Sequence, residues 1–168
     1  GSNFRCARVD RSGRVHGPRC VRLPPRPAAK RVLEIMKAEL KAALSSAPRV
    51  RRVSLSLKGI VDAERGISLH IGGFQGWRRI PVGPHLGRSL GLPVLIENDV
   101  RCAALGERWM GHARGVDDFV FVIVGTGIGT GIMRAGRLVR GARGLAGEYG
   151  HMVVDASDRR FRCSCGEY

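Results

Sequence analysis

The chain has no long hydrophobic run, although 43% of its 168 residues are hydrophobic. No run approaches the roughly 18 consecutive apolar residues of a membrane-spanning helix, which excludes such a helix. The first four residues, GSNF, have neither the apolar segment nor the small-residue cleavage site of a signal peptide. Because the hydrophobic fraction still suffices for a sizeable core, we expect a soluble, cytoplasmic chain that forms one domain or one lobe of a larger enzyme.

Lysine is scarce: four of the 29 basic residues are lysines, and the formal net charge is +15. A basic chain raises nucleic acid as a partner. The arginines, however, are scattered along the sequence and form no basic tract of about five to eight residues. An arginine-rich coding background therefore explains the charge better than a nucleic-acid surface, which stays as the weaker alternative.

The five cysteines form no disulfide framework, because three of them are isolated in the sequence: Cys6, Cys20 and Cys102. An odd number without framework spacing fits a reducing compartment. Cys163 and Cys165 stand two positions apart before a glycine, a turn sequence that can direct both thiolates toward one metal ion. Together with His151 they supply three zinc ligands, one fewer than a closed structural site requires. Two reduced loop cysteines are the alternative interpretation.

Hydrophobic periodicity predicts a mixed α/β chain. Residues 4–10 and the segment after Gly13 have the pattern of a β-hairpin. Apolar residues recur every three or four positions over residues 29–45, which is the period of an amphipathic helix. Strict alternation over residues 53–57 predicts a strand that packs against this helix. We expect the glycine-rich residues 66–87 to be irregular.

Asn98 and Asp99 follow a short apolar strand, residues 94–96, and precede a helix predicted over residues 100–110. In open α/β sheets, ligands collect at the carboxyl ends of the strands. An aspartate held there by Asn98 can act as a general base toward a sugar hydroxyl that attacks a phosphoryl group. Taken alone, Asp99 is explained better as the N-cap of the helix.

A glycine-rich loop, residues 125–131, follows the unbroken apolar run of residues 119–124, which predicts a strand covered on both faces. The loop is not followed by the Lys-Ser or Lys-Thr of a Walker motif. Backbone N–H groups at Gly125 and Gly127 and the hydroxyl of Thr126 can converge on a phosphate. A glycine-rich hairpin is an equal alternative.

Four motifs, in this order, resemble the ROK family of sugar kinases and sugar-responsive repressors: Glu97-Asn98-Asp99, the loop of residues 125–131, the segment of residues 141–151, and Cys163-Ser164-Cys165-Gly166. The resemblance implies an α/β, actin-like (ribonuclease H-like) ATPase fold. Residues 1–113 would form the N-terminal lobe, truncated at its start. Residues 114–168 would begin the second lobe, with the phosphate loop and part of a zinc motif.

The resemblance also implies a role for each matching residue. Asp99 would be the base toward the 6-hydroxyl of a hexose, and Asn98, Glu148 and His151 would contact the sugar. The phosphates of ATP, bound with Mg²⁺, would lie at Gly125, Thr126 and Gly127. His151, Cys163 and Cys165 would hold a structural zinc, whose fourth ligand the family motif places just beyond Tyr168.

Three departures from the family pattern leave the identity of the sugar open: Lys58 replaces a usual Pro, Gly73 a frequent Asn, and Arg101 another frequent Asn. We expect the parent protein to be a glucokinase-like, ATP-dependent sugar kinase and a homodimer, of which this chain is an incomplete and inactive fragment. The alternative is the effector-binding domain of a ROK-type repressor, which would bind DNA through an upstream module.

Overall fold

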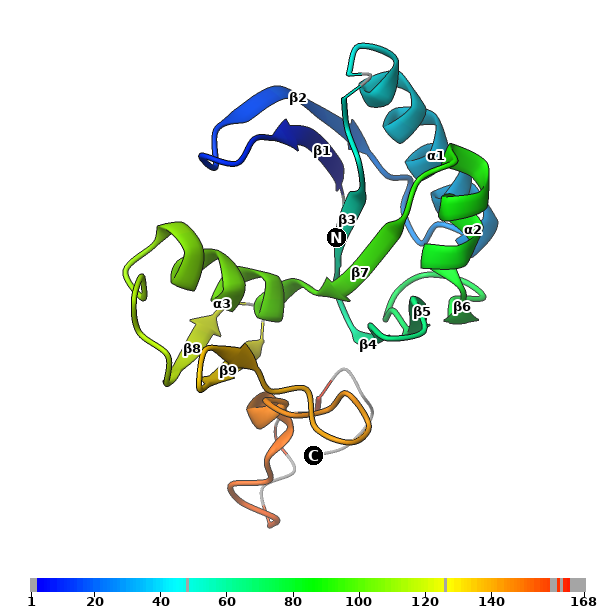
Figure 1. Ribbon diagram of the computed structural model, residues 1–168. Helices are drawn as coiled ribbons and strands as arrows, with labels where there is room; N and C mark the ends of the chain where they lie inside the picture. Colours follow the sequence, from blue (N-terminus) through cyan, green and yellow to red (C-terminus); the bar gives the residue numbers. More distant parts are fainter. Residues whose placement is uncertain (1–2, 48, 126, 158–159, 161, 164–168) are drawn as a thin grey trace. The chain divides into compact units, whose positions relative to one another are not determined.

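The computed structural model describes residues 3–47, 49–125, 127–157, 160 and 162–163. The chain divides into two compact units, Gly1–Cys102 and Ala103–Tyr168. Helices and strands occur in both units, as the periodicity predicts (Figure 1). The division falls inside a helix, and the lobe boundary after residue 113 stays a prediction. In the part of the chain that the structure describes, no helix is long and apolar enough to cross a membrane.

The described residues of the first unit form three small sheets, two complete helices and the start of a third helix. Its elements are β1 (Asn3–Val9), β2 (Val15–Arg22), α1 (Ala29–Ser45), β3 (Val53–Leu57), β4 (Ile60–Asp62), β5 (Ile67–His70), β6 (Arg78–Ile80), α2 (Val82–Leu90) and β7 (Val94–Asn98). The antiparallel hairpin β1–β2, the parallel pair β3–β7 and the antiparallel order β4-β5-β6 make up the sheets.

The second unit is built on one antiparallel hairpin. Helix α3 (Asp99–Met110) leads into β8 (Phe119–Val124), β9 (Ile128–Arg134), β10 (Arg137–Leu138) and the short 3₁₀ helix η1 (Tyr149–His151). Strand β9 lies between β8 and β10. The predicted strand of residues 119–124 therefore forms, but the prediction that it is covered on both faces is wrong for the described chain. Its last residue, Val124, is 77% exposed, and Val120 and Val122 are exposed as well. An unbroken apolar run indicates a strand without showing what covers it.

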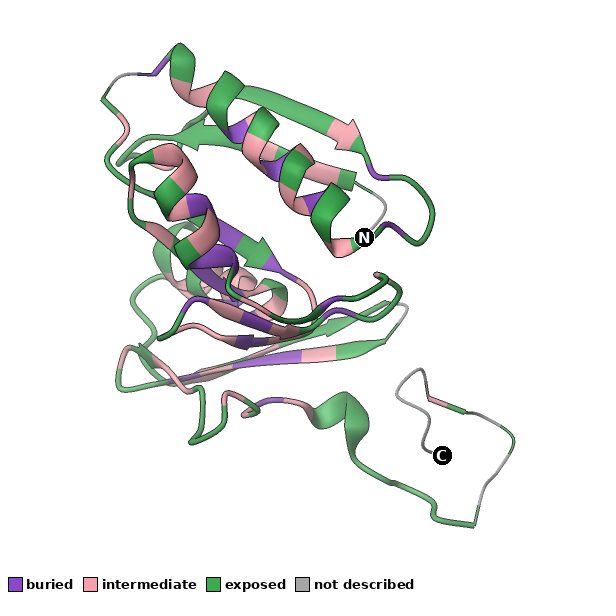
Figure 2. Cartoon of the chain, turned by 90° about the vertical axis from the view of Figure 1, so that its right-hand side faces the viewer, coloured by how far each residue is buried: buried purple, intermediate pink, exposed green. Residues whose placement is uncertain are grey.

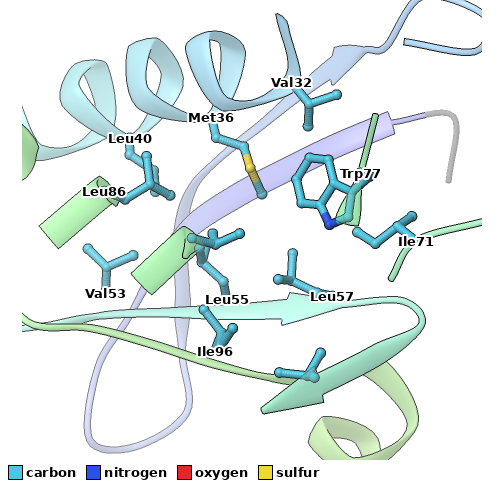
Figure 3. Close-up of a cluster of buried hydrophobic side chains, with 12 residues drawn as sticks. Val32, Met36, Leu40, Val53, Leu55, Leu57, Ile71, Trp77, Leu86 and Ile96 are labelled. Carbon is cyan, nitrogen blue, oxygen red and sulfur yellow. The ribbon is translucent and has the colours of Figure 1, made fainter. Parts of the chain in front are cut away.

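The core of the first unit lies between α1 and the β3–β7 pair. Val32, Met36 and Leu40 are four residues apart and form the buried face of α1 (Figure 2). Alternate residues of β3, Val53, Leu55 and Leu57, are buried as well (Figure 3). A fully buried side chain of this size contributes about 1.5–3 kcal/mol through removal from water. The two periodicities that predict these elements thus also identify the residues that hold them together.

The prediction that residues 66–87 are irregular is wrong. This segment contains β5, β6 and the start of α2. Ser68 of β5 is fully buried, and Val82 and Leu86, four residues apart on α2, are also fully buried. The many glycines conceal this pattern, because several of them serve turns between very short elements.

Gly59 closes the turn between β3 and β4. Its φ is +83°, and a Cβ atom there would collide with the backbone carbonyl of His70. Only glycine allows both this conformation and this close approach. The turn therefore brings the carbonyl of Gly59 to a fixed position at the carboxyl end of β3.

Asn98 ties this turn to the start of α3. Its Oδ1 accepts hydrogen bonds from the backbone N–H groups of Val100, at 3.0 Å, and Arg101, at 3.1 Å. Its Nδ2 donates to the carbonyl of Gly59 at 3.0 Å. Asn98 thus caps α3, and Asp99 is the first residue of the helix rather than its N-cap. The interpretation of Asp99 as the N-cap is therefore wrong.

Replacing Gly59 by Ala is expected to destabilise the protein more than replacing Gly73 by Ala. Both glycines have a φ of +83°, but nothing lies within 4 Å of a Cβ at Gly73. G73A should cost about 1 kcal/mol for the left-handed backbone, and G59A about 2 kcal/mol more for the collision. Urea denaturation of both variants measures the difference, and equal free energies of unfolding would contradict the close approach at Gly59.

Removal of the Asn98 side chain is expected to cost more stability than removal of the Asp99 side chain. N98A loses a helix cap and a further hydrogen bond, about 2 kcal/mol in all. D99A loses mainly a favourable charge at the helix N-terminus, about 0.5 kcal/mol. The same denaturation measurement gives both values. If D99A proved the more destabilising of the two, Asp99 rather than Asn98 would be the cap.

Candidate functional site

A cavity of about 260 Å³ opens in the first unit beside Asp99. Ligand pockets for small molecules usually measure about 300–1,000 Å³, so this one suits a compact ligand. Most of its wall is apolar, and its polar side chains are those of Asn3, Ser56, Lys58 and Asp99. The apolar part comes from Phe4, Leu23, Val32, Met36, Leu57, Ile71, Phe74 and Trp77. An apolar wall with a few polar groups is the usual character of a specific small-molecule site.

The carboxylate of Asp99 is accessible in this cavity. Its side chain is exposed, and it accepts a hydrogen bond from the N–H of the next residue, Val100, at 3.0 Å. Because Asn98 also accepts this N–H and alone reaches that of Arg101, the helix does not depend on Asp99. A carboxylate that is held in place yet open to a ligand meets the geometric condition for a general base.

A series of contacts from Lys58 through Phe74 to Trp77 holds part of the cavity wall in place. The Nζ of Lys58 donates to the carbonyl of Gly72 at 2.8 Å and lies 5.1 Å from the centre of the Phe74 ring. Phe74 meets Trp77 edge to face, with ring centroids 5.5 Å apart. Figure 3 shows Trp77 beside Ile71, with Met36 and Val32 of α1 near its ring.

Trp77 is in turn fixed from behind. Its indole N–H donates to the hydroxyl of Ser68 at 2.8 Å, and both side chains are buried. Sequence reasoning missed this wall because it treated residues 66–87 as irregular. Two features of the sequence could have indicated it: the aromatic residues Phe74 and Trp77 are three positions apart, and Lys58 replaces a Pro that is usual in the family pattern.

A buried ion pair lies at the junction of β7 and α3. Arg101 is 2% exposed, and its Nη1 is 3.7 Å from Oε1 of Glu97. The same oxygen of Glu97 accepts the backbone N–H of Asn98 at 2.9 Å. Two charges buried together this way constrain the backbone on both sides of Asn98, and loss of either partner would weaken the compensation of the other buried charge.

In the second unit, two glycines bring Glu148 and His151 close to β9. A Cβ at Gly147 would collide with the carbonyl of Thr130, and a Cβ at Gly150 would collide with the carbonyl of Ile128. Gly147 also has a φ of +88°, which favours glycine. Glu148 is half-buried, and its carbonyl accepts the N–H of His151 at 3.0 Å. The Gly-Glu-Tyr-Gly-His segment is thus laid against β9 by its glycines, which leaves the imidazole of His151 exposed.

Two of the three predicted metal ligands lie together. The Nδ1 of His151 is 3.8 Å from the Sγ of Cys163. The third predicted ligand, Cys165, lies outside the described residues. Among the described residues there is no group of three side chains suited to a metal ion.

The predicted phosphate loop begins as the turn between β8 and β9. Gly125 donates its N–H to the carbonyl of Gly127 at 2.9 Å, and Gly129 and Gly131 belong to β9. Among the described residues, the chain neighbours of each glycine aside, no atom lies within 4 Å of the positions that Cβ atoms would take at Gly125 and Gly127. Thr126, the third predicted phosphate contact, lies outside the described residues.

The predicted site residues are thus divided between the two units. Asn98 and Asp99 belong to the first, and Gly125, Gly127, Glu148, His151 and Cys163 to the second. Within each unit, the turns and helix caps described above explain how the predicted site residues are positioned. Their combination in a single site stays a prediction.

Comparison with known proteins agrees with the motifs. The model of the ROK family matches residues 1–168. A β-glucoside kinase from Listeria monocytogenes is 40% identical over 118 residues, 70% of this chain and 40% of its own length. A xylose repressor from Caldicellulosiruptor bescii is 32% identical over 135 residues, 80% of this chain and 33% of its own.

Among solved structures, a ROK family glucokinase from Streptomyces griseus, in complex with glucose and AMPPNP, matches with a TM-score of 0.86 and 32% identity. The match covers 99% of this chain and 51% of that protein. The chain therefore spans between a third and about half of the length of these relatives. The fold is the actin-like ATPase fold of the ROK sugar kinases that it matches, as the motifs imply. On its motifs, its fold and a match over its whole length, this chain belongs to the ROK family.

Proposed function

We propose that the protein carrying this chain phosphorylates the 6-hydroxyl of a hexose with ATP, as a cytoplasmic, glucokinase-like enzyme. The observation that carries the proposal is the state of Asp99, whose carboxylate lines a cavity while Asn98 caps the helix. A catalytic aspartate must be held in a fixed position, and its carboxylate oxygens must still be available to accept a proton from the substrate. The Streptomyces glucokinase, solved with glucose and AMPPNP, is one of the relatives that act on a sugar.

The predicted site residues of the two units would then have different roles. Asp99 accepts the proton of the hydroxyl as its oxygen attacks the phosphoryl group. Asn98 positions this carboxylate, since its amide joins α3 to the carbonyl of Gly59, and it would also contact the sugar. Phe74 offers apolar surface to the carbon face of the sugar, the buried Trp77 supports the Phe74 ring from behind, and Glu148 and His151 of the second unit would contact further hydroxyls.

The turn after β8 fits the phosphates of ATP. Glycines at positions 125 and 127 carry no side chain, and no described residue beyond their chain neighbours lies within 4 Å of where a Cβ would be, so an anion could approach the main chain closely. When bound there with Mg²⁺, ATP supplies the phosphoryl group. Gly125, Gly127 and Thr126 would hold the phosphates by their main-chain and hydroxyl groups.

The side chains near the end of the chain fit a structural zinc. In a tetrahedral site with Zn–N near 2.1 Å and Zn–S near 2.3 Å, the two ligand atoms lie about 3.6 Å apart. The 3.8 Å between His151 and Cys163 is close to that value. His151, Cys163 and Cys165 would hold the metal, which would fix the segment that carries Glu148.

A sugar-responsive repressor is the second candidate, and the Caldicellulosiruptor bescii xylose repressor supports it, because its likeness covers 80% of this chain. In that case the cavity beside Asp99 would bind an effector sugar without chemistry. The accessible carboxylate favours the kinase, because a site that only binds sugar does not need a base.

In the full-length protein, D99N is expected to lower kcat for hexose phosphorylation by a factor of about 10² to 10⁴. Hexose binding, measured by calorimetry, should stay within about tenfold, because Asn retains hydrogen-bonding capacity. The control is E64Q, which neutralises an exposed carboxylate outside the cavity and should leave kcat unchanged. Unchanged turnover in D99N would remove Asp99 from the mechanism. If the wild-type protein bound hexose without phosphorylating it, and the sugar altered its affinity for DNA, the repressor would be the correct function.

Zinc should be present at close to one equivalent in the freshly reduced full-length protein, and C163S should lose most of it. C20S is the control, because Cys20 is an exposed thiol of β2 in the other unit. Atomic absorption measures the metal. Less than about 0.1 equivalent in the wild-type protein, or equal zinc contents in the two variants, would contradict the zinc site.

A further inference from the structure

A second, larger hollow in the first unit is strongly basic. It has a volume of about 820 Å³ and lies between the tip of the β1–β2 hairpin and the segment that joins α1 to β3. Its ten lining residues are Arg8, Val9, Asp10, Arg11, Ser46, Ala47, Arg49, Val50, Arg51 and Arg52. We call this hollow the arginine groove.

A uniform excess of arginine does not explain the composition of the groove. Arginine makes up 25 of the 168 residues of the chain, but five of the ten residues that line the groove. The cavity beside Asp99 has twelve lining residues and no arginine among them. Five of the 25 arginines are therefore gathered in one concave place.

Among the described residues, the five guanidinium groups of the groove have no acidic partner. Within the described residues, no carboxylate lies within 4 Å of the side-chain nitrogens of Arg8, Arg11, Arg49, Arg51 or Arg52. Arg8 has a neutral partner instead, because it donates to the carbonyl of Ser46 at 3.4 Å. This contact links the hairpin to the segment after α1.

The one acidic residue of the groove is engaged in its own turn. Asp10 accepts hydrogen bonds from Nε2 of His16 at 2.9 Å, and from the hydroxyl of Ser12 and the backbone N–H of Arg14. These bonds, that of His16 above all, hold the pKa of Asp10 well below its usual range. The carboxylate thus stabilises the hairpin tip and leaves the arginines to an external anion.

The charge, size and lining of the groove indicate which kind of anion it could bind. Guanidinium forks match phosphate oxygens in pairs, and they retain their charge at any physiological pH. The volume is that of a small-molecule site. No aromatic side chain lines the groove, whereas sites for single-stranded nucleic acid usually stack the bases on aromatic rings.

We propose that the arginine groove is a binding site for a compact anion made of several linked phosphates and without bases. The site shares no lining residue with the cavity beside Asp99. It is therefore independent of the proposed kinase activity and can exist in either a kinase or a repressor.

The test is calorimetric titration of the full-length protein with inorganic triphosphate. R49Q/R51Q/R52Q removes three exposed charges of the groove and should raise Kd by at least about tenfold, since each removes a charge-assisted contact. The control R65Q/R78Q/R88Q removes the same charge from exposed positions of the same unit outside the groove, and its Kd should stay within about twofold. D99N should bind triphosphate as tightly as the wild type. The test of the groove is therefore independent of whether the proposed kinase activity is correct.

Two results would overturn the proposal. If the two triple variants bound triphosphate equally, the affinity would come from net charge or from another site such as the turn after β8. The second probe is an oligothymidylate of about fifteen nucleotides, which tests for binding of single-stranded nucleic acid. If it bound more tightly than triphosphate, and only the groove variant lost it, the groove would be a nucleic-acid site instead.

Discussion

The side-chain amide of Asn98 is the contact on which the first unit's site depends. One end of the amide holds the first N–H groups of α3, and the other end holds the carbonyl of Gly59 beyond β3. Because β3 and β7 pair in parallel, with Leu57 opposite Asn98, both attachments lie at the carboxyl end of the same pair of strands. The amide therefore determines where α3 begins, and with it where the carboxylate of Asp99 is presented. Glycine at position 59 and the buried pair Glu97–Arg101 support the same junction from either side.

Much of the fold could be predicted from residue periodicity. The helix of residues 29–45 and the strand of residues 53–57 are found at the predicted bounds, because each depends on a regular alternation of buried and exposed side chains, and the strand of residues 119–124 follows from its unbroken apolar run. The prediction fails for residues 66–87, where elements of three to nine residues alternate with glycine turns and are too short to show a period. It also fails for the environment of β8, since a strand's composition does not specify its neighbours.

The candidate site was predictable only in part, because some of its residues come together through contacts that local sequence does not show. Asn98 and Asp99 are recognisable because they directly follow a strand, but local sequence does not distinguish which of the two caps the helix. Lys58, Phe74 and Trp77 come together through contacts between different turns. The arginine groove was missed for the same reason, since Arg8 and Arg49 are far apart in the chain and become neighbours when the hairpin meets the segment after α1. Scattered charges in a sequence can therefore be concentrated in the fold.

The second unit shows how glycine can position functional groups without contacting a ligand. Gly147 and Gly150 bring their segment against β9, and this places the backbone of Glu148 and the imidazole of His151. His151 then lies beside Cys163, so one side chain is a candidate for both sugar binding and metal binding. A zinc bound there would couple the order of the chain's last residues to the sugar-contacting segment.

The most direct measurement of the central claim is a crystal structure of the full-length protein with a hexose. The account predicts that the sugar occupies the cavity lined by Phe74 and Trp77, with its 6-hydroxyl at about 2.6–3.2 Å from the carboxylate of Asp99. It also predicts that the amide of Asn98 keeps its bond to the carbonyl of Gly59. A hexose bound elsewhere, or bound in the cavity with another hydroxyl group facing Asp99, would contradict the account.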